Sequence, residues 1–560
     1  MKRILLYIHA ILVLSSGVTC QTRFAGKENR DQEGEAKQTD PGVWQADRGD
    51  GTYRNPVLHA DYSDPDVIRV GDDFYMTASS FNCVPGLPLL HSKDLVNWNL
   101  VGHALPLLSP AEVFNTSQHG GGVWAPCLRY HNNEFYIFYP DPDRGIYLVR
   151  SSSIAGPWSE PRLVMAGEGL IDPSPLWDDD GNAYLVFAFA GSRAGVKSVL
   201  IVCKMDPASC RVTGNGVMVF DGHPAHPTVE GPKFYKRNGY YYIFAPAGGV
   251  KYGWQLVLRS KNVFGPYEER IVLAQENTSV NGPHQGAWVN THTGEDWFIH
   301  FQDKGPYGRV VHLQPMQWVD DWPVIGTDSD NDGIGEPVTS FRKPDVAMVY
   351  PVATPPESDE FNGPTPGLQW QWHANPSVTW GYPAGLMGFY RLNCIARPDH
   401  YRNLWDVPNL FLQKLPAEAF TATASVIFHP RAEGDEAGMV MMGQDYRYIS
   451  LLRAGEKLFV RVVQCTGANK GTEEKIIYSE EIQEPELYLR VKVESGASCS
   501  FSYSTDGRQF ITCGEVFNAS PGMWIGAKTG FFALSNGFVN DAGGLDIDWF
   551  RIEKNNEDNK

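Results

Sequence analysis

The feature that most constrains the fold is one hairpin phrase that occurs five times between residues 64 and 301. Each copy has a short apolar run, a polar turn rich in Gly, Asn or Asp, and an aromatic run, which is the pattern of a β-hairpin. The copies read DPDVIRVGDDFYMTAS, APCLRYHNNEFYIFY, DPSPLWDDDGNAYLVFAF, GPKFYKRNGYYYIFAP and GAWVNTHTGEDWFIHF. The pattern predicts an all-β domain built from repeats.

The spacing of the copies indicates how many strands each repeat contributes. The equivalent positions are Pro65, Pro126, Pro173, Pro232 and Ala287. They follow one another at intervals of 61, 47, 59 and 55 residues, which is enough for four strands each. A flat sheet of about twenty strands would curl or split, whereas four-stranded sheets around a central channel form a propeller. We therefore expect residues 53–345 to form a five-bladed β-propeller.

Three carboxylates lie at the starts of these hairpins. Asp64 and Asp172 directly precede the aligned proline of their repeats, and Glu230 lies one residue earlier in its own. Because the innermost strand of each blade lines the channel, we expect these three side chains to meet in one cavity. Acidic residues beside Pro and Gly also form turns, and we assign Asp61 and Asp66 to turn and blade structure because no other repeat supports a role for them.

A second β domain is predicted for residues 358–554, after a Pro-rich linker at 346–357. Apolar and polar side chains alternate along residues 420–428, and the same alternation occurs in 487–493 and 545–549. Antiparallel strands of this kind indicate two packed sheets, a β-sandwich.

The N-terminus reads as an export signal. Within residues 1–20, two basic residues precede an apolar run that is too short to span a bilayer as a mature helix. We expect a signal peptide and an exported protein, periplasmic or extracellular, with soluble export and lipid anchoring at Cys20 both open. Residues 21–52 are polar and are expected to be a tether or a loosely attached strap, and residues 555–560 a polar tail. No other segment is long enough to cross a membrane as a helix.

The charge of the chain excludes one class of partner. Lys and Arg number 47 and Asp and Glu number 65, so the formal net charge is −18. Nucleic acid, with its phosphate backbone, would be repelled. The oligomeric state is not indicated by any feature of the sequence.

The chain carries no zinc-type spacing of Cys and His. The stretch DSDNDGIGEP from Asp328 resembles a calcium loop, but Thr339 occupies the position where an EF-hand requires Glu. We interpret it as an acidic hairpin turn.

Eight cysteines besides Cys20 could pair in an oxidising compartment, although a large domain does not require disulfides. Two pairs are close enough in sequence to form hairpin disulfides, Cys203 with Cys210 and Cys499 with Cys513.

Three carboxylates from different blades fit the cleavage of a glycosidic bond with inversion. One acid protonates the leaving oxygen, and a base on the opposite side of the sugar activates water. A further negative charge nearby raises the pKa of the acid because it disfavours the ionised form. Asp172 can act in this way on Glu230.

The order of the motifs resembles glycoside hydrolase family 43, the five-bladed propeller enzymes of β-xylosidase and α-L-arabinofuranosidase type. The matching motifs, within residues 53 to about 345, are NPVLHADYSDPDVIRVGDDFYMTASSF, HSKDLVNW, GGGVWAP, IDPSPLW and VEGPKFY. The part from SDEFNGP at Ser358 to DIDWFRI at Asp546 resembles the concanavalin-like, jelly-roll sandwich that accompanies some of these enzymes.

The resemblance implies that Asp64 is the general base, Asp172 the pKa modulator and orienter, and Glu230 the general acid. It also implies substrate contacts from Phe81, Trp124, His284 and Arg309. The two aromatic residues could instead be core side chains, and the arginine could form a plain salt bridge. The histidine could hold a central water or ion, or could be a hydrogen-bonded core residue. No cofactor is required, and a structural cation in the channel near His284 is left open, with no other metal indicated.

We therefore expect an exported, exo-acting inverting glycosidase that removes terminal xylose or arabinose from plant oligosaccharides or polysaccharides such as xylan. The alternative is a non-catalytic lectin that uses the propeller or the sandwich to bind carbohydrate. A binding module has no need of an unpaired acid and base, so three carboxylates in one cavity favour the enzyme.

Overall fold

The computed structural model describes residues 41–537 and 543–555. The predicted signal peptide, with Cys20, lies outside the described residues, as does most of the predicted C-terminal tail. Within the described ranges, no helix has the length and apolar character needed to cross a membrane.

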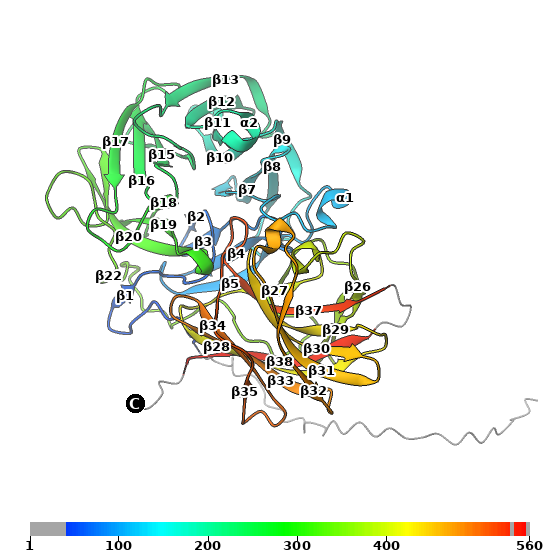
Figure 1. The fold of residues 1–560 in the computed structure, drawn as a ribbon. Coiled ribbons are helices and arrows are strands. Elements are labelled where there is room, and N and C mark those ends of the chain that lie inside the picture. The colour runs from blue at the N-terminus through cyan, green and yellow to red at the C-terminus, as the bar shows by residue number, and fades with distance from the viewer. Residues whose placement is uncertain (1–40, 538–542, 556–560) are drawn as a thin grey trace, which may run out of the picture. The chain divides into compact units, whose positions relative to one another are not determined.

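Five antiparallel four-stranded sheets confirm the five-bladed propeller (Figure 1). Blades 1 and 2 contain β2 (Asp66–Val70), β3 (Asp73–Thr77), β4 (Gly86–Ser92), β5 (Trp98–Leu105), β6 (Cys127–His131), β7 (Glu134–Asp141), β8 (Gly145–Ser151) and β9 (Arg162–Ala166). Blade 3 contains β10 (Leu170–Trp177), β11 (Ala183–Phe189), β12 (Val199–Met205) and β13 (Val212–Asp221). Blades 4 and 5 contain β14 (Lys233–Arg237), β15 (Tyr240–Ala247), β16 (Trp254–Ser260), β17 (Glu268–Leu273), β18 (His284–Asn290), β19 (Asp296–Asp303), β20 (Arg309–Val319) and β21 (Trp322–Ile325).

Each predicted hairpin supplies the first two strands of a blade. Figure 1 shows the first strands β2, β10 and β18 toward the middle of the ring of sheets, and the fourth strands β13 and β17 at its rim. In each blade the strands pair in chain order, from the first to the fourth. The first strand of each predicted hairpin therefore lies at the inner edge of its sheet. The starts of the first strands, where the three carboxylates lie, therefore converge.

The ring is closed by segments from both ends of the propeller. Strand β1 (Thr52–Arg54) pairs with β22 (Ser340–Arg342), and Leu58 pairs with Val311. One apolar cluster contains Val67 of blade 1 together with Ile299 of blade 5, both at most 1% exposed. Two single-turn helices, α1 (Ala111–Phe114) and α2 (Gly191–Ala194), lie in connecting loops.

The C-terminal domain is a β-sandwich of two eight-stranded sheets, as predicted. One sheet contains β23 (Gln371–Trp372), β26 (Ile395–Ala396), β27 (Phe411–Lys414), β29 (Glu436–Met442), β30 (Tyr446–Ala454), β31 (Lys457–Cys465), β32 (Lys475–Ile482) and β37 (Lys528–Ser535). The other contains β24 (Gly381–Ala384), β25 (Phe389–Asn393), β28 (Phe420–His429), β33 (Glu486–Glu494), β34 (Ser498–Ser504), β35 (Ile511–Thr512), β36 (Phe517–Asn518) and β38 (Gly544–Glu553).

The alternation along β28 and β33 is confirmed, because the inward-facing side chains of both strands are at most 1% exposed. For β38 the prediction is wrong at Trp549. The register between β28 and β38 shifts between Ser425 and Val426. Phe550, which is fully buried, therefore occupies the core position expected for Trp549.

Hydrogen bonds connect the propeller to the sandwich. Val84 and Trp372 exchange backbone hydrogen bonds of 2.9 and 2.7 Å. The carboxylate of Asp61 accepts a 2.9 Å hydrogen bond from the backbone N–H of Gly526. The sandwich is thus tied to the chain segment that precedes the first carboxylate of the site.

Neither of the two possible hairpin disulfides is formed, because all eight cysteines of the described chain are buried free thiols. Cys203 and Cys210 pack in one apolar cluster, and Cys499 and Cys513 in another. These side chains serve as small apolar core residues instead.

The acidic stretch from Asp328 is a loop closed by paired backbones at Thr327 and Glu336. The carboxylate oxygens of Asp328, Asp330 and Asp332 lie within 4.8 Å of one another. Backbone N–H groups of the same loop donate to these carboxylates. Such bonds are those of an acidic turn.

Candidate active site

A cavity of about 120 Å³ collects all seven predicted site residues. Every blade contributes to its wall, and one side chain comes from the sandwich. The lining residues are Asp64, Phe81, Trp124, Ala125, Ile171, Asp172, Glu230, Val250, His284, Gln285, Arg309 and Trp524. The convergence expected from the repeat is therefore present.

Asp64 lies just before β2 and is held by three side chains. Its Oδ2 accepts hydrogen bonds of 2.9 Å from Ser63 and 2.5 Å from Ser79. Nη1 of Arg309 lies 3.1 Å from Oδ1 and 3.3 Å from Oδ2. Asp64 has a φ of +55°, a strained value that persists only where the surroundings impose it. The carboxylate is fixed in one orientation.

Asp172 lies in β10 at the equivalent position of blade 3 and has nearly the same strained φ, +56°. Its Oδ2 accepts a 2.7 Å hydrogen bond from the backbone N–H of Gly231, and its Oδ1 accepts one of 3.3 Å from Gln285. Burial, and then the negative charge of Glu230, raise the pKa of Asp172 to about 7. A smaller effect in the same direction comes from Asp64.

Glu230 is the most open of the three carboxylates. Its side chain is 25% exposed, compared with 6% for Asp64. Its backbone N–H donates to the carbonyl of Pro246, which fixes the chain just before β14. Its Oε1 lies 3.1 Å from Nε2 of His284, within hydrogen-bonding distance. The side chain of Glu230 can therefore contact a ligand while its Oε1 contacts His284.

His284 and Arg309 both contact carboxylates. His284 is 1% exposed, and its Nδ1 has no hydrogen-bond partner among the described residues. Arg309 forms the salt bridge that the sequence left open, with Asp64. Its backbone N–H also donates a 2.9 Å hydrogen bond to Oδ1 of Asp61.

One wall of the cavity is aromatic. The rings of Phe81 and Trp124 lie 6.3 Å apart, edge to face, and Trp524 lies 6.0 Å from Trp124 in the same arrangement. Phe81 also packs against Cys83 and Ile525, and it is 2% exposed. Phe81 therefore packs like a core side chain while it lines the cavity, and Trp124 is half-buried there. A flat apolar wall of this kind suits the face of a sugar ring.

The residues of the site that were not predicted include Gln285, Ser79 and Trp524. Gln285 follows a predicted residue in the chain, but nothing in its neighbourhood distinguishes it from a surface amide. Ser79 lies in the TASSF motif beside Phe81. No pattern in the sequence indicates that Trp524 lies at the cavity, because it belongs to a loop of the other domain.

Asp61 and Asp66 do not line the cavity. Asp66 is fully buried and forms a 2.9 Å ion pair with Arg129 inside the propeller. Asp61 does more than shape a turn, since its two oxygens accept from Arg309 and from Gly526 of the sandwich.

Comparison with known sequences assigns both domains. The sequence profile of glycosyl hydrolases family 43 matches residues 53–323. The profile of the beta xylosidase C-terminal concanavalin A-like domain matches residues 358–553.

Relatives match along most of the chain. A putative beta-xylosidase from Xylanibacter ruminicola is 39% identical over 86% of this chain and 86% of its own length. A non-reducing end alpha-L-arabinofuranosidase from Bacteroides ovatus is 31% identical over 91% of this chain and 96% of its own. The crystal structure of a xylan beta-1,4-xylosidase from Bacillus halodurans is 25% identical and has a TM-score of 0.78, covering 90% of this chain and 100% of that one.

Proposed function

From the premise that the chain belongs to glycosyl hydrolases family 43 and is a glycoside hydrolase, we propose that it removes terminal β-xylose or α-L-arabinofuranose with inversion. The observation that carries this proposal is the gathering of Asp64, Asp172 and Glu230 in one small cavity. The substrates are plant oligosaccharides or polysaccharides that end in these pentoses, xylan among them.

Asp64 is the general base in this proposal. The two serine hydroxyls and the guanidinium of Arg309 fix both of its oxygens and offset its charge. A base held in this way can take a proton from a water placed against the sugar, and positioning by rigid neighbours lowers the barrier. Arg309 therefore acts chiefly by orienting the base.

Glu230 is the general acid, and Asp172 acts on it in two ways. The repulsion between the two carboxylates opposes ionisation of both at once, so the pair keeps a proton to higher pH than an isolated carboxyl would. The hydrogen bond from Gly231 to Asp172 also fixes the backbone beside Glu230. Because Glu230 is the most exposed of the three, its proton can reach the leaving oxygen.

The shape of the cavity supports exo action. Trp524 and Trp124 line one side of it, and the two aspartates are almost fully buried, at 4% and 5% exposure. A closed pocket accepts the end of a chain, whereas cleavage within a chain requires a groove open on both sides.

No cofactor enters this mechanism. We propose that the unpartnered Nδ1 of His284 faces a water or a structural cation in the channel. A neutral imidazole nitrogen is a suitable ligand for either. Such a group would hold the ring that contacts Glu230, and metal analysis of the purified protein tests whether a cation is retained.

A lectin is the less favoured function. Incubation of the purified protein with p-nitrophenyl β-D-xylopyranoside and with p-nitrophenyl α-L-arabinofuranoside distinguishes an enzyme from a lectin. We expect the protein to hydrolyse at least one of these substrates. Binding without turnover of either aryl glycoside, or of xylan and arabinan fragments, would refute the enzyme.

We also propose that the chain is exported, on the strength of the pattern within residues 1–20. Fractionation of the source cells, together with a Cys20→Ser variant, tests both forms of export. Loss of membrane association in the variant indicates a lipid anchor, unchanged release indicates a soluble protein, and retention in the cytosol contradicts export.

A further inference from the structure

Gln285 lines the catalytic cavity, but the proposed mechanism gives it no role. It is the second residue of β18 in blade 5 and is 3% exposed. Burying an amide costs free energy unless its polar atoms are hydrogen-bonded. Its Nε2 lies 3.3 Å from Oδ1 of Asp172, within hydrogen-bonding distance. Because an ionised carboxylate can only accept hydrogen bonds, the NH₂ end of the amide is the end that faces Asp172.

Two irregularities of the sheets bring these side chains together. In β10 the register against β11 shifts over a stretch that contains Asp172. In β18 the register against β19 shifts between His284 and Gly286, so Gln285 is an extra residue in its strand. Asp172 and Gln285 have φ values of +56° and +39°, strained values that persist where the surroundings impose them. Such bulges change the direction of a side chain, and these two direct the side chains toward each other from blades 3 and 5.

The amide of Gln285 also packs against the residue that follows the proposed acid. A Cβ on Gly231 would lie 2.9 Å from Cγ and Cδ of Gln285, so glycine at this position leaves the room that the glutamine occupies. The backbone N–H of Gly231 donates its 2.7 Å hydrogen bond to Oδ2 of Asp172. Each oxygen of Asp172 therefore accepts one N–H, and the three residues form one packed unit beside Glu230.

Most of the surroundings of Asp172 oppose its ionisation. Burial and the negative charges of Glu230 and Asp64 act in this direction. Lys233 acts in the other direction, but its Nζ donates a hydrogen bond to a backbone carbonyl. The other titratable residues that line the cavity contact the other two carboxylates, and they are His284, 3.1 Å from Glu230, and Arg309, 3.1 Å from Asp64. Hydrogen bonds donated to a carboxylate favour its ionised form, so the two N–H donors stabilise the ionised Asp172 by direct contact.

We propose that Gln285 is a positioning residue, whose amide holds Asp172 in place and in its ionised form, so that the proton shared by the two carboxyls lies on Glu230. The proposal rests on the acid role of Glu230 described above. Without the amide, the ionised form of Asp172 is less stable, and the shared proton lies more often on Asp172, where it does not reach the leaving oxygen. The pair then keeps its proton to a higher pH but delivers it less often.

The pH dependence of kcat/KM tests this role with Gln285→Met and Gln285→Leu, which both remove the amide. With an aryl glycoside we expect the maximum to fall by up to about tenfold and the descending limb to move to higher pH by up to about one unit. In an Asp172→Asn background the same substitutions should not move the limb, because the amide then has no carboxylate to stabilise. A lower maximum with an unmoved limb, or an equal shift in both backgrounds, would show that Gln285 only fills space and would overturn the proposal.

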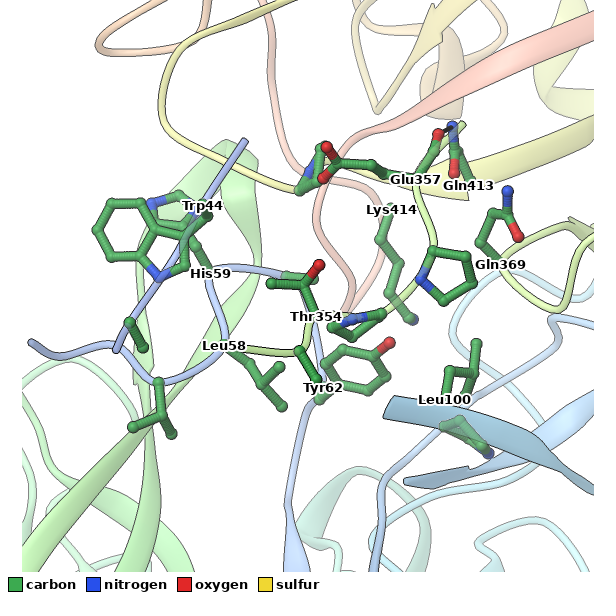
Figure 2. A pocket seen from close by; sticks show the side chains of 18 of the residues that line it. Trp44, Leu58, His59, Tyr62, Leu100, Thr354, Glu357, Gln369, Gln413 and Lys414 are labelled. Atoms are coloured by element: carbon green, nitrogen blue, oxygen red, sulfur yellow. Dashed lines mark hydrogen bonds between the residues drawn. The ribbon is translucent and has the colours of Figure 1, made fainter. Parts of the chain in front are cut away.

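Gln413→Met is the matched control, because it removes another buried amide. Gln413 is 2% exposed, and its Nε2 donates a 2.9 Å hydrogen bond to the carbonyl of Glu357. Figure 2 shows both residues at a different cavity, which none of the three catalytic carboxylates lines. The control should keep the descending limb of the wild type. A limb that moves equally in the control would contradict a specific role for Gln285.

Urea unfolding separates this proposal from the proposed activity, because it requires no turnover. In Gln285→Met the folded state should bind the proton of Asp172 more tightly than in the wild type, whereas the two unfolded chains bind it equally. The free energy of unfolding of the wild type should therefore exceed that of the variant by a margin that grows as the pH rises through about 7, where Asp172 ionises. A margin that is the same at about pH 5 and about pH 9 would overturn the proposal, whether or not the aryl glycosides are hydrolysed.

Discussion

The backbone N–H of Gly231 donates a 2.7 Å hydrogen bond to Oδ2 of Asp172. A carboxylate of blade 3 thereby fixes the residue that follows Glu230 in blade 4. The same carboxylate has a pKa of about 7, raised by burial and by the charge of Glu230. One neighbour therefore fixes the backbone beside the proposed acid and interacts with it electrostatically.

Replacing Asp172 with Asn should shift the pH dependence of activity. The substitution removes the charge that opposes ionisation of Glu230, so the proton on the pair should be lost at lower pH. We expect the descending limb of kcat/KM to move to lower pH. Plots of kcat/KM against pH for the wild type and the variant, with one aryl glycoside as substrate, measure this shift. Descending limbs at the same pH would show that Asp172 does not affect the ionisation of the acid.

The Asp172→Asn substitution should also change how the free energy of unfolding depends on pH. The carboxyl of Asp172 ionises near 3.8 in the unfolded chain and near 7 in the folded one. The folded state therefore binds the proton more tightly, and the stability from this group is present below pH 3.8 and lost as the pH rises to about 7. The stability of Asp172→Asn relative to the wild type should rise over this interval. Urea unfolding of both proteins at several pH values measures the difference in their free energies of unfolding. A difference that does not change with pH would contradict the raised pKa of Asp172.

Replacing Glu230 with Gln removes the proposed acid and should lower kcat by about 10²–10⁴-fold on an unactivated disaccharide. An aryl glycoside has a better leaving group and should lose less. Asp179→Asn, at a side chain that is 90% exposed, is the matched control and should leave both rates unchanged. Equal losses on the two substrates would argue against the acid role.

Replacing Asp64 with Asn should abolish turnover and leave substrate affinity nearly intact, because the base is needed only for the attack of water. Isothermal titration with xylobiose measures affinity. In Asp64→Gly, azide should restore part of the rate, since it needs no base to attack the sugar. A variant that turns over at the wild-type rate would exclude Asp64 as the base.

The propeller and its three carboxylates could be predicted from the sequence because both depend on one repeated pattern. Asp64 and Asp172 occupy the same position in two blades, and Glu230 is displaced by one residue. The blade topology then carries such positions to one cavity. Periodicity likewise predicted the inward face of β28.

The rest of the site depends on contacts that no local pattern encodes. Trp524 reaches the cavity only through the packing of one domain on the other. Asp61 sits in a motif that reads as a turn, but its oxygens bridge Arg309 and Gly526. Trp549 was misplaced because a single register shift exchanged the two faces of its strand.

Replacing Trp524 with Ala should raise KM by roughly two- to tenfold, the loss expected for one aromatic contact. The effect on kcat should be smaller, because the side chain contacts neither the base nor the acid. Trp549→Ala, in β38 of the same domain, is the control and should leave KM unchanged. An unaltered KM in Trp524→Ala would show that the sandwich only braces the propeller.

The measurement that tests the account most directly is the anomeric configuration of the first product, followed by proton NMR. If Asp64 activates water on the side of the sugar opposite Glu230, the configuration is inverted. A β-xyloside should then yield α-xylose first, and an α-L-arabinofuranoside should yield the β-anomer, with mutarotation only afterwards. Initial release of the retained anomer would contradict the assigned roles of Asp64 and Glu230.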